Sequence, residues 1–126
     1  MSASQFPELR AMSARQAASA LARYERHVRR LAATWLDMEL YARVSEEIDE
    51  ITRFTSADPA LAVSCTALLM SHAELVHALW AGAQPSAAAD PGEAALRLEE
   101  HLHCIDALAR RCVRIGGAAA SDDRTG

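Results

Sequence analysis

The chain has 126 residues, of which 51% are hydrophobic and 24% charged, and its formal net charge at pH 7 is −4. This length supports one domain with a modest core, and the composition excludes the disordered class. The net acidity, and the absence of aromatic residues on the arginine-bearing face of residues 15–30, argue against a nucleic-acid-binding protein.

Residues 13–55, which follow a lead-in over 1–12, contain no Gly or Pro and are rich in residues that favour a helix. At helical spacing, the two halves of this segment carry apolar stripes on opposite sides. The segment between the stripes, Trp35 to Tyr41, is too apolar for a surface loop. We therefore expect one continuous long helix, one stripe of which has to be covered by a second chain.

A turn near Thr34 is the alternative, because Thr34-x-x-Asp37 has the pattern of a helix-starting capping box. Such a turn would divide residues 13–55 into two antiparallel helices. The chain would then be a monomeric up-down four-helix bundle.

Asp58-Pro59 and Asp90-Pro91 each have the pattern of a helix start, and Gly116-Gly117 that of a helix end. The remaining segments are a helix over 59–81, a linker over 83–90, a helix over 91–115 and a flexible tail over 116–126. The sequence thus predicts an all-α protein, a long helix plus an antiparallel helical hairpin, which dimerises into a helical bundle.

The three cysteines, Cys65, Cys104 and Cys112, have neither CxxC nor zinc-site spacing. Their odd number fits a reducing compartment, and the N-terminus lacks a signal-peptide pattern, so we expect a cytoplasmic protein. The longest uncharged run, Pro59 to Ala73, is shorter than the ~20 residues that a membrane span needs. We therefore expect no membrane partner.

Two histidines, His72 and His101, fall on the apolar stripes of the last two helices. In an antiparallel hairpin turning near residue 87, they lie at the same height. Docking the long helix through a tight turn near Ala57 brings Tyr41 to that height as well. The sequence predicts a buried polar layer of His72, His101 and Tyr41 that fixes helix register, or alternatively a pH-sensitive joint or metal site.

Two short motifs resemble functional sites of known helical families. Glu74-x-x-His77 and Glu100-x-x-His103 resemble the paired motifs of ferritin-like di-iron proteins, which imply a metal site, but both lie toward the polar side of their helices. The segment His77 to Gly82 resembles the exposed-histidine segment of histidine phosphotransfer domains, but it lacks their lysine and its glycine is displaced by one position.

The sequence contains no nucleophile–base pair and no Gly-rich phosphate loop, so we assign no catalytic, cofactor-binding or metal-binding residues and expect a non-enzyme. The function that we expect is that of a small interaction protein, a scaffold, adaptor or chaperone-like homodimer that works through an apolar helix seam. A metal-binding or pH-responsive bundle and a histidine phosphotransfer-like bundle are the alternatives.

Overall fold

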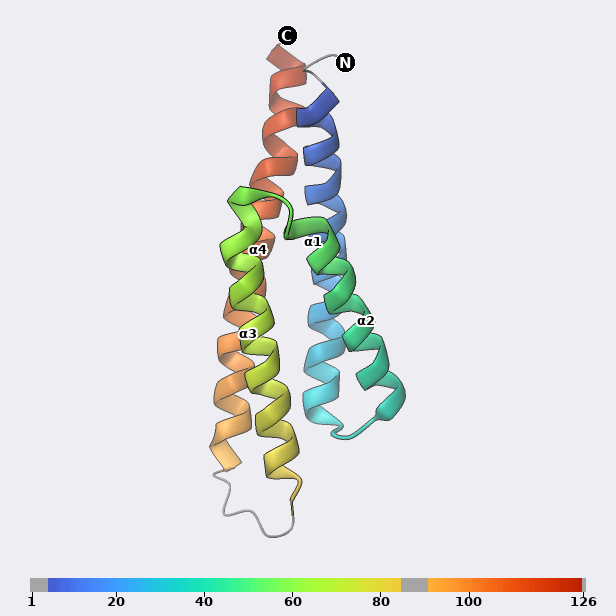
Figure 1. The fold of residues 1–126 in the computed structure, drawn as a ribbon, viewed down its shortest axis with the longest axis vertical. Helices are drawn as coiled ribbons and strands as arrows, with labels where there is room; N and C mark the ends of the chain where they lie inside the picture. Colours follow the sequence, from blue (N-terminus) through green and yellow to red (C-terminus); the bar gives the residue numbers. More distant parts are fainter. Residues whose placement is uncertain (1–4, 85–90, 126) are drawn as a thin grey trace.

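The structure, a computed structural model, describes residues 5–84 and 91–125 and is all-helical over that part of the chain. Its helices are α1 (Gln5–Ala33), α2 (Met38–Thr55), α3 (Pro59–Gly82) and α4 (Pro91–Thr125). They alternate in direction, up and down, along one elongated bundle (Figure 1). The prediction of an all-α bundle is confirmed.

The prediction of one continuous helix over residues 13–55 is wrong, because the helix ends at Ala33 and a new one begins at Met38. Asp37 caps α2 by accepting a hydrogen bond from the backbone N–H of Leu40 at 3.1 Å. The Thr34 hydroxyl instead donates to a carbonyl of the preceding helix, so Thr34 is not the cap that the capping-box pattern suggested.

The connection between α1 and α2 is apolar because it is covered by another helix. The indole of Trp35 packs edge-on against the ring of Trp80 in α3, with centroids 5.1 Å apart, and against Tyr41, with centroids 6.0 Å apart. Loops avoid apolar residues only where they run over the surface in water. Here the loop closes one end of the bundle, so its apolar residues are compatible with a turn.

Both apolar stripes of residues 13–55 are buried inside the same molecule. Leu21 and Val28 of α1 and Val44 and Ile51 of α2 are each at most 1% exposed. The chain thus supplies the cover that the continuous helix would have required from a partner. In the bundle, α1 packs closely on α4, α3 packs on α4, and α2 packs mainly on α1.

The prediction that the last helix ends at Gly116-Gly117 is also wrong, because α4 runs on to Thr125 in place of a flexible tail. Likewise, α1 begins at Gln5, inside the expected lead-in. The two helices extend beyond the α2–α3 connection and pack on each other there (Figure 1). Buried Gly116 faces Ala11, and the Arg15 guanidinium donates to the Gly116 carbonyl at 3.1 Å. Because Gly116 has no Cβ, α1 and α4 can pack closely at this position. The glycine does not end the helix.

The start of α3 follows from Asp58, which accepts from the Ala60 N–H, and from Pro59 at the first helical position. Arg10 of α1 clamps Asp58 through two hydrogen bonds of 2.6 and 3.2 Å. This contact joins the α2–α3 connection to α1. Most of the predicted linker over 83–90, including the Asp90 cap, lies outside the described residues.

Candidate functional site

A layer of hydrogen-bonded polar side chains crosses the middle of the bundle. The structure brings His72 of α3 and His101 of α4 together, with ring centroids 5.7 Å apart. His101 is completely buried, and His72 is partly so. The pairing reflects the antiparallel packing of α3 and α4, which places their apolar faces at matching heights.

The tyrosine of this layer is Tyr24 of α1, and the prediction of Tyr41 is wrong. The Tyr24 hydroxyl lies 2.6 Å from Nδ1 of His72 and 2.6 Å from Nε2 of His101. Tyr41 contacts Trp35 near the α1–α2 turn instead. Tyr24 is fully buried and belongs, at helical spacing, to the apolar stripe of the first half of residues 13–55. Recognising it from the sequence required the turn that brings α1 alongside α3 and α4.

Ser71 completes the layer, and with its hydroxyl hydrogen on the Leu68 carbonyl the four side chains form one self-consistent set of hydrogen bonds. That hydroxyl donates to the Leu68 carbonyl, which can only accept, at 3.1 Å. The Ser71 oxygen therefore accepts from Nδ1–H of His101 at 2.6 Å. A neutral imidazole has one N–H, so Nε2 of His101 accepts from the Tyr24 hydroxyl. The Tyr24 oxygen then accepts from Nδ1–H of His72, and the four groups form one directional chain that ends on the backbone.

The electrostatics of the layer keep all its members neutral at pH 7. Burial, and to a smaller extent the neighbouring His72, together lower the pKa of His101 from 6.5 to about 3. Burial also lowers the pKa of His72, although the nearby Asp49 carboxylate opposes this effect. Burial raises the pKa of Tyr24 well above 10, and the charge of Glu47 adds to the increase.

The two histidines differ in how they can take up a proton. On His101 a second proton has to enter at Nε2, where the Tyr24 hydroxyl already donates, so two donors would face each other in a buried site. His72 has its Nε2 outside the chain and can be protonated while Nδ1–H still donates to Tyr24. A second proton on His101 would therefore set two donors against each other, whereas one on His72 would not.

Comparison of the chain with protein-family models, with curated proteins and with solved structures finds no match. The site therefore has to be interpreted from its own chemistry. A tyrosine, two neutral imidazoles and a serine link α1, α3 and α4 at one height through hydrogen bonds, which suits a role in helix register.

The residues of the two Glu-x-x-His motifs lie outside this layer. Arg97 takes the centre of the group, pairing with Glu74 at 3.1 Å, Glu93 at 2.9 Å and Glu100 at 3.1 Å. A guanidinium there occupies the carboxylates that a metal ion would need. No group of three or more metal-ligating side chains occurs in residues 5–84 and 91–125.

The three cysteines are free thiols within the bundle. Cys65 and Cys112 are buried and Cys104 is half-buried, and none of them forms a disulfide. Burial, and to a smaller extent the charge of Asp58, together raise the pKa of Cys112 to about 11. Because the thiolate is the reactive form, Cys112 acts as a small apolar core residue.

Proposed function

We propose that the protein is a small helical interaction module, a scaffold or adaptor that self-associates through the outer face of α3. The observation that carries this proposal is the exposure of large apolar side chains on that face. On that face Val63 is 81% exposed and Met70 60%, and Trp80 (40%) and Leu69 (38%) are exposed on its flank, about 100–120° round the helix. An apolar patch of this kind on a small domain is typical of a binding surface.

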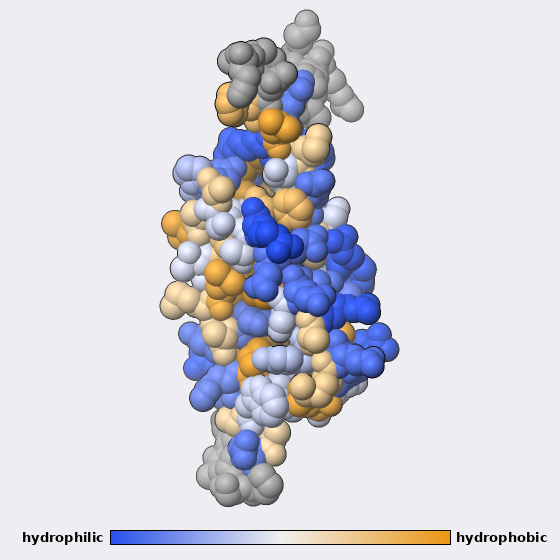
Figure 2. Space-filling view, turned by 45° about the vertical axis from the view of Figure 1, so that its right-hand side comes forward, coloured by the Kyte–Doolittle hydropathy of each residue, from blue (hydrophilic) through white to orange (hydrophobic). Residues whose placement is uncertain are grey.

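The composition of α3 supports the same proposal. From Pro59 to Ala73 the helix carries no charged residue, although much of it faces outward. Figure 2 shows a mainly hydrophilic surface on the right, over α2, and a surface of mixed hydrophobic and hydrophilic residues toward the left edge, where α3 lies. The apolar stripes of residues 13–55, which the sequence predicted as the binding seam, are buried in the core and are not available to a partner. In this proposal the exposed apolar residues of α3 are the binding surface instead.

By length and composition α3 could also cross a membrane, and only 28% of its most apolar 18-residue window is buried in the bundle. Its polar side chains favour a protein partner. Ser71 and His72 hydrogen-bond to α4 and α1, so moving α3 into lipid would break the buried layer. Three free cysteines agree with a cytoplasmic setting.

An acid-responsive bundle is a second candidate function, and the observation that favours it is the Tyr24–His101 hydrogen bond. Protonation of His101 removes this bond and introduces a buried charge, so acid should loosen the packing of α1 against α4. This behaviour would add a condition under which the interaction module opens.

The experiment for the proposed function is the molar mass of the purified protein by light scattering at micromolar concentration. The 13.6 kDa chain should run as a dimer, and Val63→Glu should reduce it to a single chain. Val113→Glu is the matched control, because Val113 is also an exposed valine, 62% exposed, but lies on α4. A wild-type monomer, or equal masses for the two variants, would refute the proposal.

A further inference from the structure

The exposed row on α3 is arranged so that it can face a copy of itself. Val63 and Met70 are two helical turns apart, and the residues between them on this face, Thr66 and Ala67, are small. We infer that α3 packs antiparallel against α3 of a second copy, around a two-fold axis passing close to Ala67. This inference rests on the proposed function, because it names the partner of the α3 face.

An antiparallel arrangement around Ala67 pairs large side chains with each other and small with small. Val63 comes opposite Met70 of the second copy, and Met70 opposite its Val63, which produces two equivalent contacts. Thr66 and Ala67 meet at the axis, where small side chains let two helices approach closely. Ala60 and Ala73 face each other at the outer ends of the contact.

The outer face of α4 also has a small central residue, Ala107, at about the height of Ala67 in α3. The α3–α4 contacts Ser71–His101 and Glu74–Arg97 fix the register of the two helices. In that register, exposed Ala107 lies beside the midpoint of Val63 and Met70, within about one helical turn. One two-fold axis perpendicular to the helices can therefore pass both Ala67 and Ala107. It sets α3 against α3 and α4 against α4.

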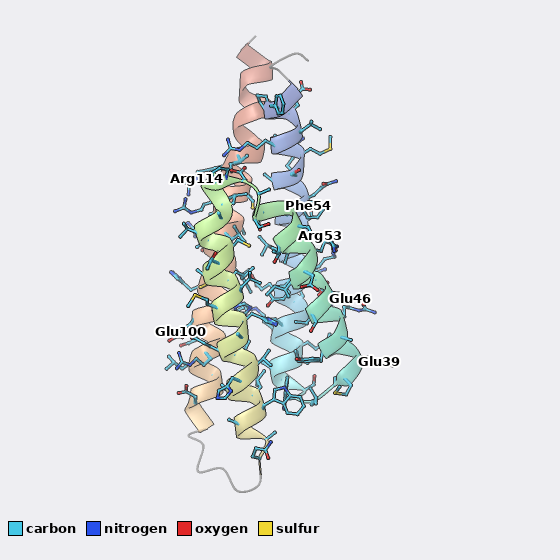
Figure 3. The ribbon with its side chains drawn as sticks, viewed as in Figure 1. Glu39, Glu46, Arg53, Phe54, Glu100 and Arg114 are labelled. Atoms are coloured by element: carbon cyan, nitrogen blue, oxygen red, sulfur yellow. The ribbon has the colours of Figure 1, made fainter. Side chains whose placement is uncertain are left out.

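Opposite charges lie at equal distances on the two sides of Ala107. Glu100 is seven residues before it and Arg114 seven residues after it, so the two-fold axis brings Glu100 opposite Arg114 of the second copy. Figure 3 shows Glu100 and Arg114 on the same side of the molecule, away from Glu39 and Glu46 of α2. A parallel arrangement would instead oppose like charges.

The charges at these two ends are also unbalanced within one copy. At the Glu100 end, one guanidinium, that of Arg97, serves three carboxylates, which leaves two negative charges in excess. At the other end, Arg111 and Arg114 make no ion pair with residues 6–84 or 92–117, which leaves two unpaired positive charges within that part of the chain. Association of two antiparallel copies would balance both ends, which is the reason for choosing a second copy as the partner.

The test is charge reversal of Glu100 and Arg114, read out as the dimer dissociation constant by sedimentation equilibrium. Each single variant, Glu100→Arg or Arg114→Glu, replaces two attractive contacts by two repulsive ones and should raise Kd about tenfold. The double variant restores opposite charges across the axis and should return Kd to within about threefold of wild type. Glu46→Arg on exposed α2 is the control and should leave Kd unchanged.

Rescue by the double variant, with circular dichroism showing equal helix content throughout, supports the antiparallel pairing. Single reversals without effect, or a double variant as weak as the singles, overturn it. If Val63→Glu still dissociates the dimer in that case, the α3 face remains the binding surface and only the two-fold arrangement is wrong. A wild-type protein that is monomeric would overturn both proposals.

Discussion

Acid should destabilise the bundle through His101, and replacing this residue by glutamine should remove the effect. His101 is completely buried, both its ring nitrogens take part in hydrogen bonds, and its pKa in the folded protein is about 3. In the unfolded chain the imidazole titrates near its ordinary pKa of 6.5. Between these two values, the unfolded state binds one more proton than the folded state.

The sign and size of the effect follow from this difference. A group that is protonated only after unfolding favours the unfolded state as the pH falls, so the stabilisation is complete above pH 6.5 and is lost progressively toward pH 3. The slope approaches about 1.4 kcal/mol per pH unit below the unfolded-state pKa, and the loss between pH 7 and pH 5 is about 2 kcal/mol. For a chain of this length, this corresponds to a fall in Tm of roughly 8 °C. His72, whose pKa is also lowered by burial, acts in the same direction.

The assay is urea unfolding at several pH values between 7 and 5, for wild type, His101→Gln and His103→Gln. Averaged from pH 7 to pH 5, the dependence of the unfolding free energy on pH should be shallower in His101→Gln than in wild type by about 1 kcal/mol per pH unit. Because a slope is compared, the loss of stability caused by the substitution itself does not enter. His103 is the matched control, since it lies on the same helix with an exposed side chain, and its replacement should leave the slope unchanged.

Parallel stability curves for wild type and His101→Gln would refute the reasoning. They would mean that His101 binds its proton equally in the folded and unfolded states, and hence that the Tyr24 hydroxyl does not donate to its Nε2. An NMR titration gives a second check, because the His101 ring signals should stay unchanged from pH 7 to pH 4.5 in the folded protein.

Tyr24→Phe should cost about 1–3 kcal/mol in urea unfolding, because it leaves two buried imidazole nitrogens without a partner, whereas Tyr41→Phe should change stability by less than about 0.5 kcal/mol. Gly117→Ala should stabilise α4 by up to about 1 kcal/mol, because nothing lies within 4 Å of the new Cβ. In Gly116→Ala the new Cβ would lie 2.7 Å from an arginine side chain of α1, so the Tm of this variant should be lower than that of Gly117→Ala. Asp58→Ala should lower stability by about 1 kcal/mol or more, and Asp58→Asn, which keeps the helix cap but loses the ion pair, by less; equal losses would show that the cap is unimportant.

Local signals in the sequence account for the helices and for part of the polar layer. The cap and proline at Asp58-Pro59 are interactions among neighbouring residues, so they can be read without knowing the fold. The equal height of His72 and His101 depends only on helical rise and on a hairpin between adjacent helices. Both features come from short-range geometry that the sequence specifies by itself.

Tertiary structure decided the points at which a residue's role depends on distant neighbours. The apolar segment around Trp35 fits a buried mid-helix as well as a covered turn, and Trp80 of α3 is what makes it a turn. That turn places Tyr24, and not Tyr41, between the histidines. Gly116 carries the same local signal whether a helix stops there or another helix packs against it, and the packing of α1 determines which occurs. Each of these residues is covered by a segment that lies far away in the chain. For this reason the local sequence could not decide its role.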